Sequence, residues 1–541
     1  MKLTDDQLKA IHDVENNSVI MACPGSGKTT VLINKMSLCC EKLKRHNGII
    51  GLSFTRKSSE ELRKKFKIKS KKYNLNYLGT IDSFLVNEII RPFLPKIWAI
   101  NVDDFEVVRV LSEEESIPFS QEYTNRQILL IDIETDSAFK GLFLEGKVWE
   151  KSVTSLALFV IKNVEICRRY ISCRYKYLFV DEYQDTSNIQ HLLFLELLSL
   201  GLKFTAVGDI DQSIYQWRDA VPKNLTSLAT DHGFHEYTID VNHRCDPSID
   251  LYARIFLTEN DKEPLVDQKI FRIHINDIDK HRYAKLDDLI KTIKDENQFE
   301  YSDFAILAAK SAPLEHYIQN TRHNYKIYED SPLDNMNHYL AQLCSDLIFY
   351  KYNKNSSAYL IYEAYKVKLK NIKFNEFKNE VKKLRLEDDV GEICKNIEKI
   401  IRKIDSNINI ENFILATKSI SDNEHYIKLY QPTNPNDLQV MTIHKAKGLE
   451  FKVVIHIGME AWVFPSKTKI NGNWENADIV ADKCLHYVAI TRAEKLCYLV
   501  NMPFRITKDK ITNDLNEKSA EKSDFLRIQR LDKHIIDLGV R

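Results

Sequence analysis

Short apolar runs rich in β-branched residues recur along the chain, and helix-like stretches separate them. The first set lies at residues 19–22, 49–54, 177–180 and 204–207. A second set lies at residues 237–241, 304–309, 438–443, 453–457 and 496–500. Strands that alternate with helices are typical of parallel sheets covered on both faces. The pattern therefore predicts an α/β protein with two parallel sheets, each flanked by helices.

Two long segments interrupt this series and set the expected domain boundaries. Residues 91–173 and residues 350–432 are expected to form mainly helical insertions, because the second segment is rich in helix formers, lysine and asparagine. The first α/β domain is expected to comprise residues 1–90 and 174–236. The second is expected to comprise residues 237–349 and 433–505. Residues 506–541 are polar and of mixed charge, and we expect a C-terminal tail with one helix and a frayed end.

Composition narrows the class of protein further. A chain of 541 residues is too long for one core. It carries 77 lysines and arginines and 77 aspartates and glutamates, so any surface for nucleic acid must be local. Its 10 cysteines form no CxxC pair, which favours reduced thiols and no zinc site. The polar N-terminus and the lack of a long apolar run predict a cytoplasmic protein with no membrane partner.

A glycine-rich loop follows the first apolar run and precedes a helix-like segment. Glycines let the backbone wrap closely round phosphates, and the helix N-terminus supplies positive potential. In this loop Lys28 would reach the β- and γ-phosphates, and the Thr29 hydroxyl would bind magnesium. The alternative is an ordinary glycine-rich turn, which the strand–loop–helix context disfavours. The nucleotide-binding residues predicted here are Ala22, Cys23, Pro24, Gly25, Ser26, Gly27, Lys28, Thr29 and Thr30.

Two adjacent carboxylates end the apolar run at residues 177–180. Asp181 would hold magnesium, and Glu182 would orient and deprotonate the attacking water. Hydrolysis needs this division, because the metal neutralises phosphate charge while a second carboxylate acts as base. Such a pair is weak evidence alone, but it gains weight beside a phosphate-binding loop.

Further basic, amide and aromatic residues stand just beyond other apolar runs. Gln212 is a candidate γ-phosphate sensor, and Tyr215 and Trp217 beside Arg218 suit stacking on bases. Taken alone, the two aromatics are more typical of core packing. Arg244 and Arg492, from the second domain, could close on the γ-phosphate as arginine fingers. Taken alone, each arginine is more typical of a surface salt bridge.

In this order, the motifs resemble those of superfamily 1 helicases of the UvrD/Rep type. The resemblance implies two RecA-like P-loop domains, with ATP bound between them and DNA bound across their top. It also implies movement along single-stranded DNA with 3′→5′ polarity. Family members commonly have alanine at the first loop position, which accounts for Ala22. The stretches that carry the resemblance are TDDQLKAI (4–11), GLSFTRKSSEEL (51–62), GTIDSF (79–84), DEYQDT (181–186), VGDIDQSIYQWRDA (207–220), VNHRC (241–245), TIHKAKGLEF (442–451) and YVAITRA (487–493).

The resemblance also implies roles for single residues. Gln7 would read adenine, and His243 stands where members often stack an aromatic ring on the base. Arg56 and Glu450 would approach the nucleotide. Lys28, Glu182, Gln212, Arg244 and Arg492 would form the catalytic set. The implied DNA-binding residues are Phe54, Thr55, Thr80, Tyr215, Trp217, Arg218 and His444.

A finer resemblance lies in GTIDSFLVNEIIRPF (79–93), which is similar to the helicase-like subunits of Gabija anti-phage defence systems. It implies a partner, a GajA-like subunit with a TOPRIM endonuclease domain, and ATP hydrolysis stimulated by DNA ends or single strands. Two alternatives stay open at this point. One is a stand-alone DNA repair helicase, and the other is a nucleotide-gated interaction subunit that separates no strands.

Overall fold

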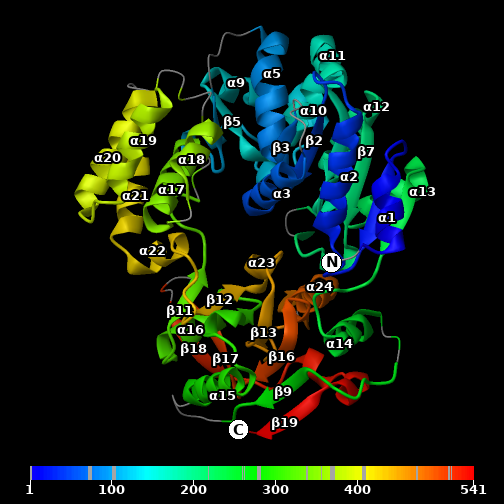
Figure 1. The fold of residues 1–541 in the computed structure, drawn as a ribbon, viewed down its shortest axis with the longest axis vertical. Helices are drawn as coiled ribbons and strands as arrows, with labels where there is room; N and C mark the ends of the chain where they lie inside the picture. Colours follow the sequence, from blue (N-terminus) through cyan, green and yellow to red (C-terminus); the bar gives the residue numbers. More distant parts are fainter. Residues whose placement is uncertain are drawn as a thin grey trace.

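The computed structural model of the chain describes residues 3–70, 76–99, 105–216, 219–258, 260, 262–276, 282–334, 336, 339–354, 356–365, 369, 372–404, 410–470, 473–509, 512 and 514–540. Figure 1 shows an upper body, which contains most of the N-terminal part of the chain, and a lower body, which contains the C-terminal end.

The first sheet has six strands, all parallel, in the order β3-β2-β6-β7-β1-β8. Its strands are β1 (Ser18–Ala22), β2 (Gly48–Ser53), β3 (Tyr77–Thr80), β6 (Tyr175–Val180), β7 (Lys203–Gly208) and β8 (His235–Ile239). Its helices are α1 (Asp5–His12), α2 (Lys28–Lys42), α3 (Arg56–Lys69), α4 (Ile81–Phe84), α12 (Asn188–Ser199) and α13 (Lys223–His232). Successive strand residues such as Val19 and Ile20 enter different apolar clusters, one on each face. The predicted parallel sheet with helices on both faces is confirmed.

The second sheet has seven parallel strands, in the order β11-β12-β10-β13-β16-β9-β19. Its strands are β9 (Ile270–His274), β10 (Phe304–Ala308), β11 (Tyr325–Tyr328), β12 (Leu438–Thr442), β13 (Phe451–His456), β16 (Ala493–Asn501) and β19 (Ile536–Val540). Its helices are α14 (Pro247–Thr258), α15 (Arg282–Asn297), α16 (Ser311–Asn320), α23 (Ile443–Ala446) and α24 (Ile479–Ile490). Apolar clusters again lie on both faces.

Two assignments made from the sequence are wrong. The strand expected at residues 237–241 of the second domain is β8, which pairs with β1 in the first sheet from Ser18 opposite His235 to Ala22 opposite Ile239. The expected tail is also folded. Its elements are the hairpin β17 (Phe504–Lys508) and β18 (Leu515–Ser519), the 3-10 helices η7 (Asp524–Arg527) and η8 (Gln529–His534), and strand β19 beside β9. An apolar run predicts that a segment forms a strand, but it does not predict which strands pair with it. Strand pairing depends on contacts between residues that are far apart in the sequence.

The first insertion packs directly against the first sheet. Its apolar side chains, such as Leu142 and Val160, share one cluster with Ile50 and Val180 of the strands. Its elements are the π-helix η1 (Leu85–Ile90), helices α5 (Arg91–Trp98), α6 (Glu113–Ser116), α7 (Glu122–Asn125), α8 (Leu130–Thr135), α9 (Ala138–Leu144), α10 (Val153–Asn163) and α11 (Glu165–Arg174), and strands β4 (Glu106–Val108) and β5 (Lys147–Trp149).

One carboxylate joins the two ends of this insertion. Glu88, in the π-helix at the start, accepts hydrogen bonds from Tyr170 (2.6 Å), Arg174 (2.9 Å) and Tyr175 (2.9 Å) at the end. Because hydrogen bonds to a charged acceptor are the stronger kind, this contact fixes the insertion to the sheet.

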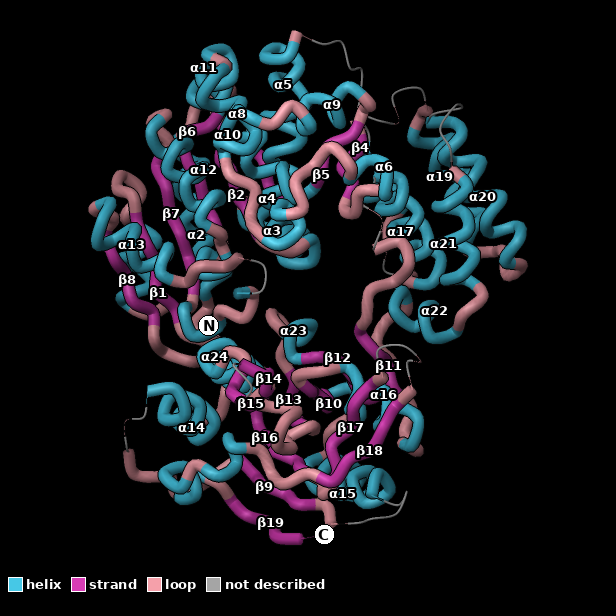
Figure 2. The backbone as a smooth tube through the Cα atoms, turned by 180° about the vertical axis from the view of Figure 1, so that it is seen from behind, coloured by secondary structure: helices cyan, strands magenta, loops and turns pink. Residues whose placement is uncertain are grey.

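The second insertion has a core of its own. Figure 2 shows its helices as a group set apart from both sheets, and its apolar side chains form a separate cluster from Leu333 to Tyr430. The first helix of the insertion begins at Tyr339, ahead of the expected boundary at residue 350. Leu340 and Leu347 of this helix belong to the separate cluster, so the helix is part of the insertion. The helices are α17 (Tyr339–Tyr352), α18 (Ala358–Tyr365), α19 (Phe374–Leu384), α20 (Val390–Ile404), α21 (Glu411–Ser421) and α22 (Glu424–Tyr430).

The separate core predicts that the second insertion unfolds on its own. Ile397 is fully buried in it, so Ile397→Ala should cost roughly 2–5 kcal/mol of local stability. Amide hydrogen exchange should quicken in α17–α22 and stay unchanged in β1 and α2. Leu386→Ala is the matched control, because Leu386 is 87% exposed and its removal should change stability by less than about 0.5 kcal/mol. Faster exchange in both regions for Ile397→Ala would contradict the prediction.

Candidate functional site

The glycine-rich loop joins β1 to α2. Gly25 and Gly27 have φ angles of 70° and 79°, in the left-handed region that favours glycine. A Cβ on Gly25 would lie 2.3 Å from Asn242 Oδ1, so the loop also needs glycine for space. Helix α2 begins at Lys28 without a side-chain cap, which leaves its first N–H groups directed at the loop. The other predicted loop residues are Ala22 at the end of β1, the buried Pro24 and Ser26, the half-buried Cys23 and Thr29, and the exposed Thr30.

Gln7 braces this loop from α1. Its Nε2 donates to the carbonyl oxygen of Ser26 (2.8 Å), and its Oε1 accepts from the Thr4 N–H (2.8 Å). The side chain is buried, and a Cβ on Gly27 would lie 3.2 Å from its Nε2. Gln7 therefore fixes the loop backbone in this structure.

The two carboxylates follow β6 beside the loop. Glu182 Oε1 lies 3.4 Å from Lys28 Nζ, and the Glu182 N–H donates to Asp181 Oδ1 (3.0 Å). Glu182 has a φ of 54°, an uncommon conformation for a residue other than glycine. Such strain concentrates at functional sites.

The pKa values of the two acids are shifted in opposite directions. Burial, and then the charge of Glu182, raise the pKa of Asp181 above its usual range. Burial also opposes ionisation of Glu182, but Lys28 and Lys447 hold the pKa of Glu182 below its usual range. Glu182 is therefore ionised at neutral pH, as a general base must be.

A hydrogen-bonded chain crosses from the first sheet to the second. Gln212 Nε2 donates to Asp209 Oδ2 (2.5 Å), and Gln212 Oε1 accepts from Arg492 Nη2 (3.1 Å). Arg492 follows α24 and is 1% exposed. Burial and the neighbouring Arg244 lower its pKa to about 9. The predicted sensor and one predicted finger are thus in direct contact.

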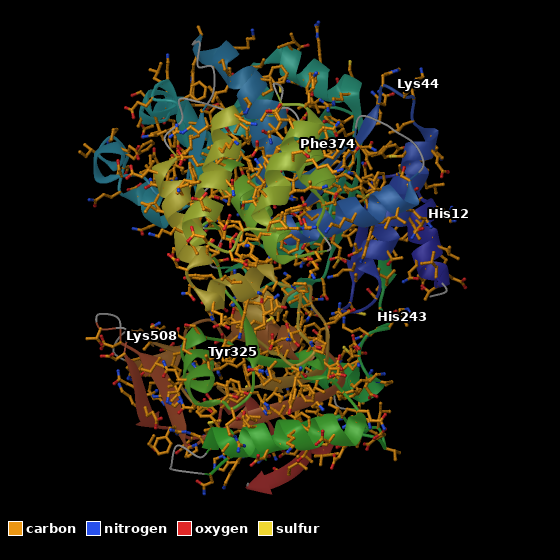
Figure 3. All side chains as sticks on the ribbon, turned by 60° about the vertical axis from the view of Figure 1, so that its left-hand side comes forward. His12, Lys44, His243, Tyr325, Phe374 and Lys508 are labelled. Atoms are coloured by element: carbon orange, nitrogen blue, oxygen red, sulfur yellow. The ribbon has the colours of Figure 1, made fainter. Side chains whose placement is uncertain are left out.

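The segment after β8 lies against the glycine-rich loop. The His243 N–H donates to the Gly25 carbonyl oxygen (3.1 Å). Arg244 Nε donates to Glu450 Oε2 (2.9 Å), and its Nη1 donates to the Thr491 carbonyl oxygen (3.4 Å). His243 is exposed, and Figure 3 shows it beside the segment that joins the two bodies. Glu450 is also exposed, with its carboxylate turned to Arg244.

Lys447 is a site residue that the sequence analysis missed. It comes from the segment after α23 in the second domain, yet its Nζ donates to Asp185 Oδ2 (2.6 Å) and to the Gln212 carbonyl oxygen (2.8 Å) in the first. It also lies 3.8 Å from Glu182 Oε2. The motif containing Lys447 was recognised, but only the contact across the domains reveals this position.

The predicted DNA-binding residues fall into two groups. Thr55 and Thr80 cap α3 and α4 by accepting the N–H groups of Ser58 (3.1 Å) and Ser83 (3.2 Å). They follow the adjacent strands β2 and β3 at one sheet edge, and Phe54 lies beside Thr55 and is partly buried. Tyr215 and His444, one from each domain, have ring centroids 6.0 Å apart. Trp217, Arg218 and the Arg56 side chain lie outside the described residues.

The two residues predicted to hold magnesium are Thr29, in the first turn of α2, and Asp181, directly after β6. Among the described residues, no group of three or more His, Cys, Asp and Glu side chains could hold a metal ion. This poor, oxygen-only set fits magnesium, which keeps waters and takes further oxygens from phosphates. Over the same residues, no helix has the length and apolar character needed to cross a membrane.

The comparisons with known proteins agree with this geometry. The family profile of the UvrD/REP helicase N-terminal domain matches residues 3–136 and 147–233, and that of the UvrD-like helicase C-terminal domain matches residues 258–502. The chain is 27% identical to the Gabija protein GajB of Bacillus cereus, over 94% of this chain and 98% of that protein. It is 24% identical to the ATP-dependent DNA helicase Rep of Buchnera aphidicola, over 94% of each chain. It is 23% identical to the ATP-dependent DNA helicase PcrA of Staphylococcus aureus, over 97% of this chain and 88% of that helicase.

The two family profiles together match well over half of the chain, including every strand of the first sheet except β8 and every strand of the second sheet except β19. The chain therefore belongs to the UvrD/Rep family of helicases and is an ATP-hydrolysing enzyme of that family.

Proposed function

We propose that ATP binds between the two sheets and is hydrolysed there by residues of both. The observation that carries this proposal is the hydrogen bond from Arg492 of the second domain to Gln212 of the first (3.1 Å), next to the loop that holds Lys28. Lys28 Nζ is buried with no hydrogen-bond partner among the described residues, and its nearest anion is Glu182 at 3.4 Å. A phosphate oxygen would supply the missing acceptor.

Magnesium would be held by the Thr29 hydroxyl and Asp181, with waters and phosphate oxygens completing its shell. When bound, it neutralises phosphate charge during transfer. A cation beside Asp181 would also offset the burial that raises the pKa of this carboxyl.

Glu182 would act as general base and take the proton of the attacking water. Gln212 would orient that water or the γ-phosphate, while Arg244 and Arg492 stabilise the charge that develops on it. Arg492 approaches from the second domain, and Arg244, on the segment that joins the two bodies, donates to the Thr491 carbonyl of that domain, so hydrolysis would require the two domains to be closed.

Four further residues would contact the nucleotide. Gln7 Nε2 has a second N–H beyond the one given to Ser26, and this group would meet the adenine. His243 would stack on the base from its exposed position, and Arg56 would approach the phosphates. Glu450, paired with Arg244, would contact the ribose or the phosphate network.

A single strand of DNA would cross the top of both domains, with the 3′→5′ polarity that the family resemblance implies. Aromatic rings bind bases without regard to sequence, so Tyr215 and His444 would stack on successive bases. Thr55 and Thr80 would contact the sugar–phosphate backbone of the DNA from the edge of the first sheet. Phe54, Trp217 and Arg218 would complete the track.

We further propose that the protein acts in anti-phage defence in the cytoplasm. The support is its likeness to the Gabija protein GajB, which extends over nearly the whole of both chains. In this role it would sense DNA ends or single strands and activate a GajA-like partner with a TOPRIM endonuclease domain.

Glu182→Gln should keep ATP binding and lower the rate of hydrolysis by roughly 10²–10⁴, because the amide cannot accept the proton from water. A fluorescent ATP analogue measures binding, and phosphate release measures turnover. Glu196→Gln on α12 is the matched control and should turn over at the wild-type rate. Undiminished hydrolysis by Glu182→Gln would remove Glu182 as the base.

The defence role predicts a stable complex with the nuclease-like product of an adjacent gene. The two proteins should co-purify when expressed together, and cells that carry both should resist phage. Cells with the Glu182→Gln variant should lose that resistance while the complex still forms. A stand-alone monomer that unwinds duplex DNA processively would instead identify a repair helicase.

A further inference from the structure

One short helix of the second domain contacts both candidate surfaces of the first. Helix α23 is a single turn, Ile443–Ala446, and Lys447 is its C-cap. The His444 ring lies 6.0 Å from Tyr215 on the candidate DNA track. Three residues further on, the Lys447 ammonium lies 2.6 Å from Asp185 Oδ2 in the candidate hydrolysis site. The two residues are therefore separated by only about 4.5 Å along the helix axis, at roughly 1.5 Å per residue.

The first domain mirrors this arrangement. Gln212 and Tyr215 are also three residues apart, in the loop after β7. Lys447 Nζ accordingly donates to the Gln212 carbonyl oxygen (2.8 Å) and lies 5.0 Å from the centre of the Tyr215 ring. A displacement of Tyr215 or His444 thus changes the surroundings of Lys447 directly.

Lys447 also helps to hold Glu182 in place. Glu182 Oε1 faces Lys28 (3.4 Å). Glu182 Oε2 accepts a hydrogen bond from Gln184 Nε2 (2.5 Å) and also faces Lys447 (3.8 Å), so this carboxylate lies between an ammonium from each domain. The Lys447 side chain is 9% exposed and that of Asp185 is 1% exposed. Buried charges of this kind require good mutual geometry, which gives the ammonium one defined position.

We propose that Lys447 is a positioning residue that couples a DNA strand on Tyr215 and His444 to the orientation of Glu182. A base stacked on these rings fixes α23, and Lys447 is fixed with it. Glu182 is then held for the attacking water, and hydrolysis quickens. This inference rests on the proposed function, in which Glu182 is the base and Tyr215 and His444 contact DNA.

The experiment compares ATP turnover with and without an oligo(dT) strand in the full chain. Lys447→Met keeps the apolar stem and removes the charge, and it should lower the ratio of stimulated to basal rate by roughly tenfold. Lys447→Arg keeps the charge and should recover most of the ratio. The KM for ATP and the Kd for oligo(dT), measured by fluorescence anisotropy, should both stay within about twofold.

Lys445→Met is the matched control. Lys445 lies on the same turn but pairs with Asp330 of the second domain, away from Glu182. It should keep the wild-type ratio of stimulated to basal turnover. A lower ratio of stimulated to basal turnover in Lys445→Met would show that any change in α23 has the same effect, and would overturn the specific role of Lys447.

A second variant separates coupling from charge neutralisation. Lys447→Met leaves Asp185 as a buried, unpaired carboxylate, whereas the Asp185→Asn/Lys447→Met double variant removes both charges and should fold more readily. The double variant should lack stimulation as the single variant does, because Glu182 has lost the same contact. Recovered stimulation would show that Lys447 serves only to neutralise Asp185, and would overturn the proposal.

The remaining outcomes are distinguishable. If wild-type protein is not stimulated by DNA, the proposed DNA role fails and the coupling fails with it. If the wild type is stimulated and Lys447→Met is stimulated equally, only the coupling fails. A variant whose basal and stimulated rates fall by one common factor also contradicts the coupling, because Lys447 then only stabilises the closed domains.

Discussion

The candidate site depends on one interaction, the hydrogen bond between a buried guanidinium of one domain and an amide side chain of the other. Arg492 is 1% exposed and donates to Gln212 across the boundary between the domains. Burial and the neighbouring Arg244 lower the pKa of Arg492 to about 9, because both destabilise the charged form of its guanidinium. A buried ion of this kind costs several kcal/mol unless an anion compensates it. A phosphate between Arg492, Arg244 and Lys28 would provide that anion.

The same constraint accounts for the surrounding contacts. Four acids and four cations lie close together where the carboxyl ends of the first sheet face the second domain. These residues are Asp181, Glu182, Asp185, Asp209, Lys28, Arg244, Lys447 and Arg492. The loop at Gly25 is pressed against Asn242, so even the phosphate-binding backbone depends on the segment that leaves the first sheet. Nucleotide binding and domain closure are therefore one event in this account.

Much of this was predictable from sequence because the chemistry lies in short local motifs. The loop at Lys28, the acids after β6 and both parallel sheets follow from runs of neighbouring residues, and the structure has them. The neighbours of β8 and β19, the bracing of the loop by Gln7 and the reach of Lys447 into the first domain did not follow. Each depends on contacts between residues far apart in the chain, where a local pattern carries no information.

The central claim is that the two domains share one hydrolysis site, and a double-mutant cycle on ATP hydrolysis tests it most directly. Single-turnover rates would be measured for Gln212→Leu, Arg492→Lys and the double variant, each with bound ATP confirmed. If the residues act through their mutual contact, the double variant loses less than the two losses combined, with a coupling of about 1 kcal/mol or more. Losses that add within roughly 0.5 kcal/mol would contradict a shared site.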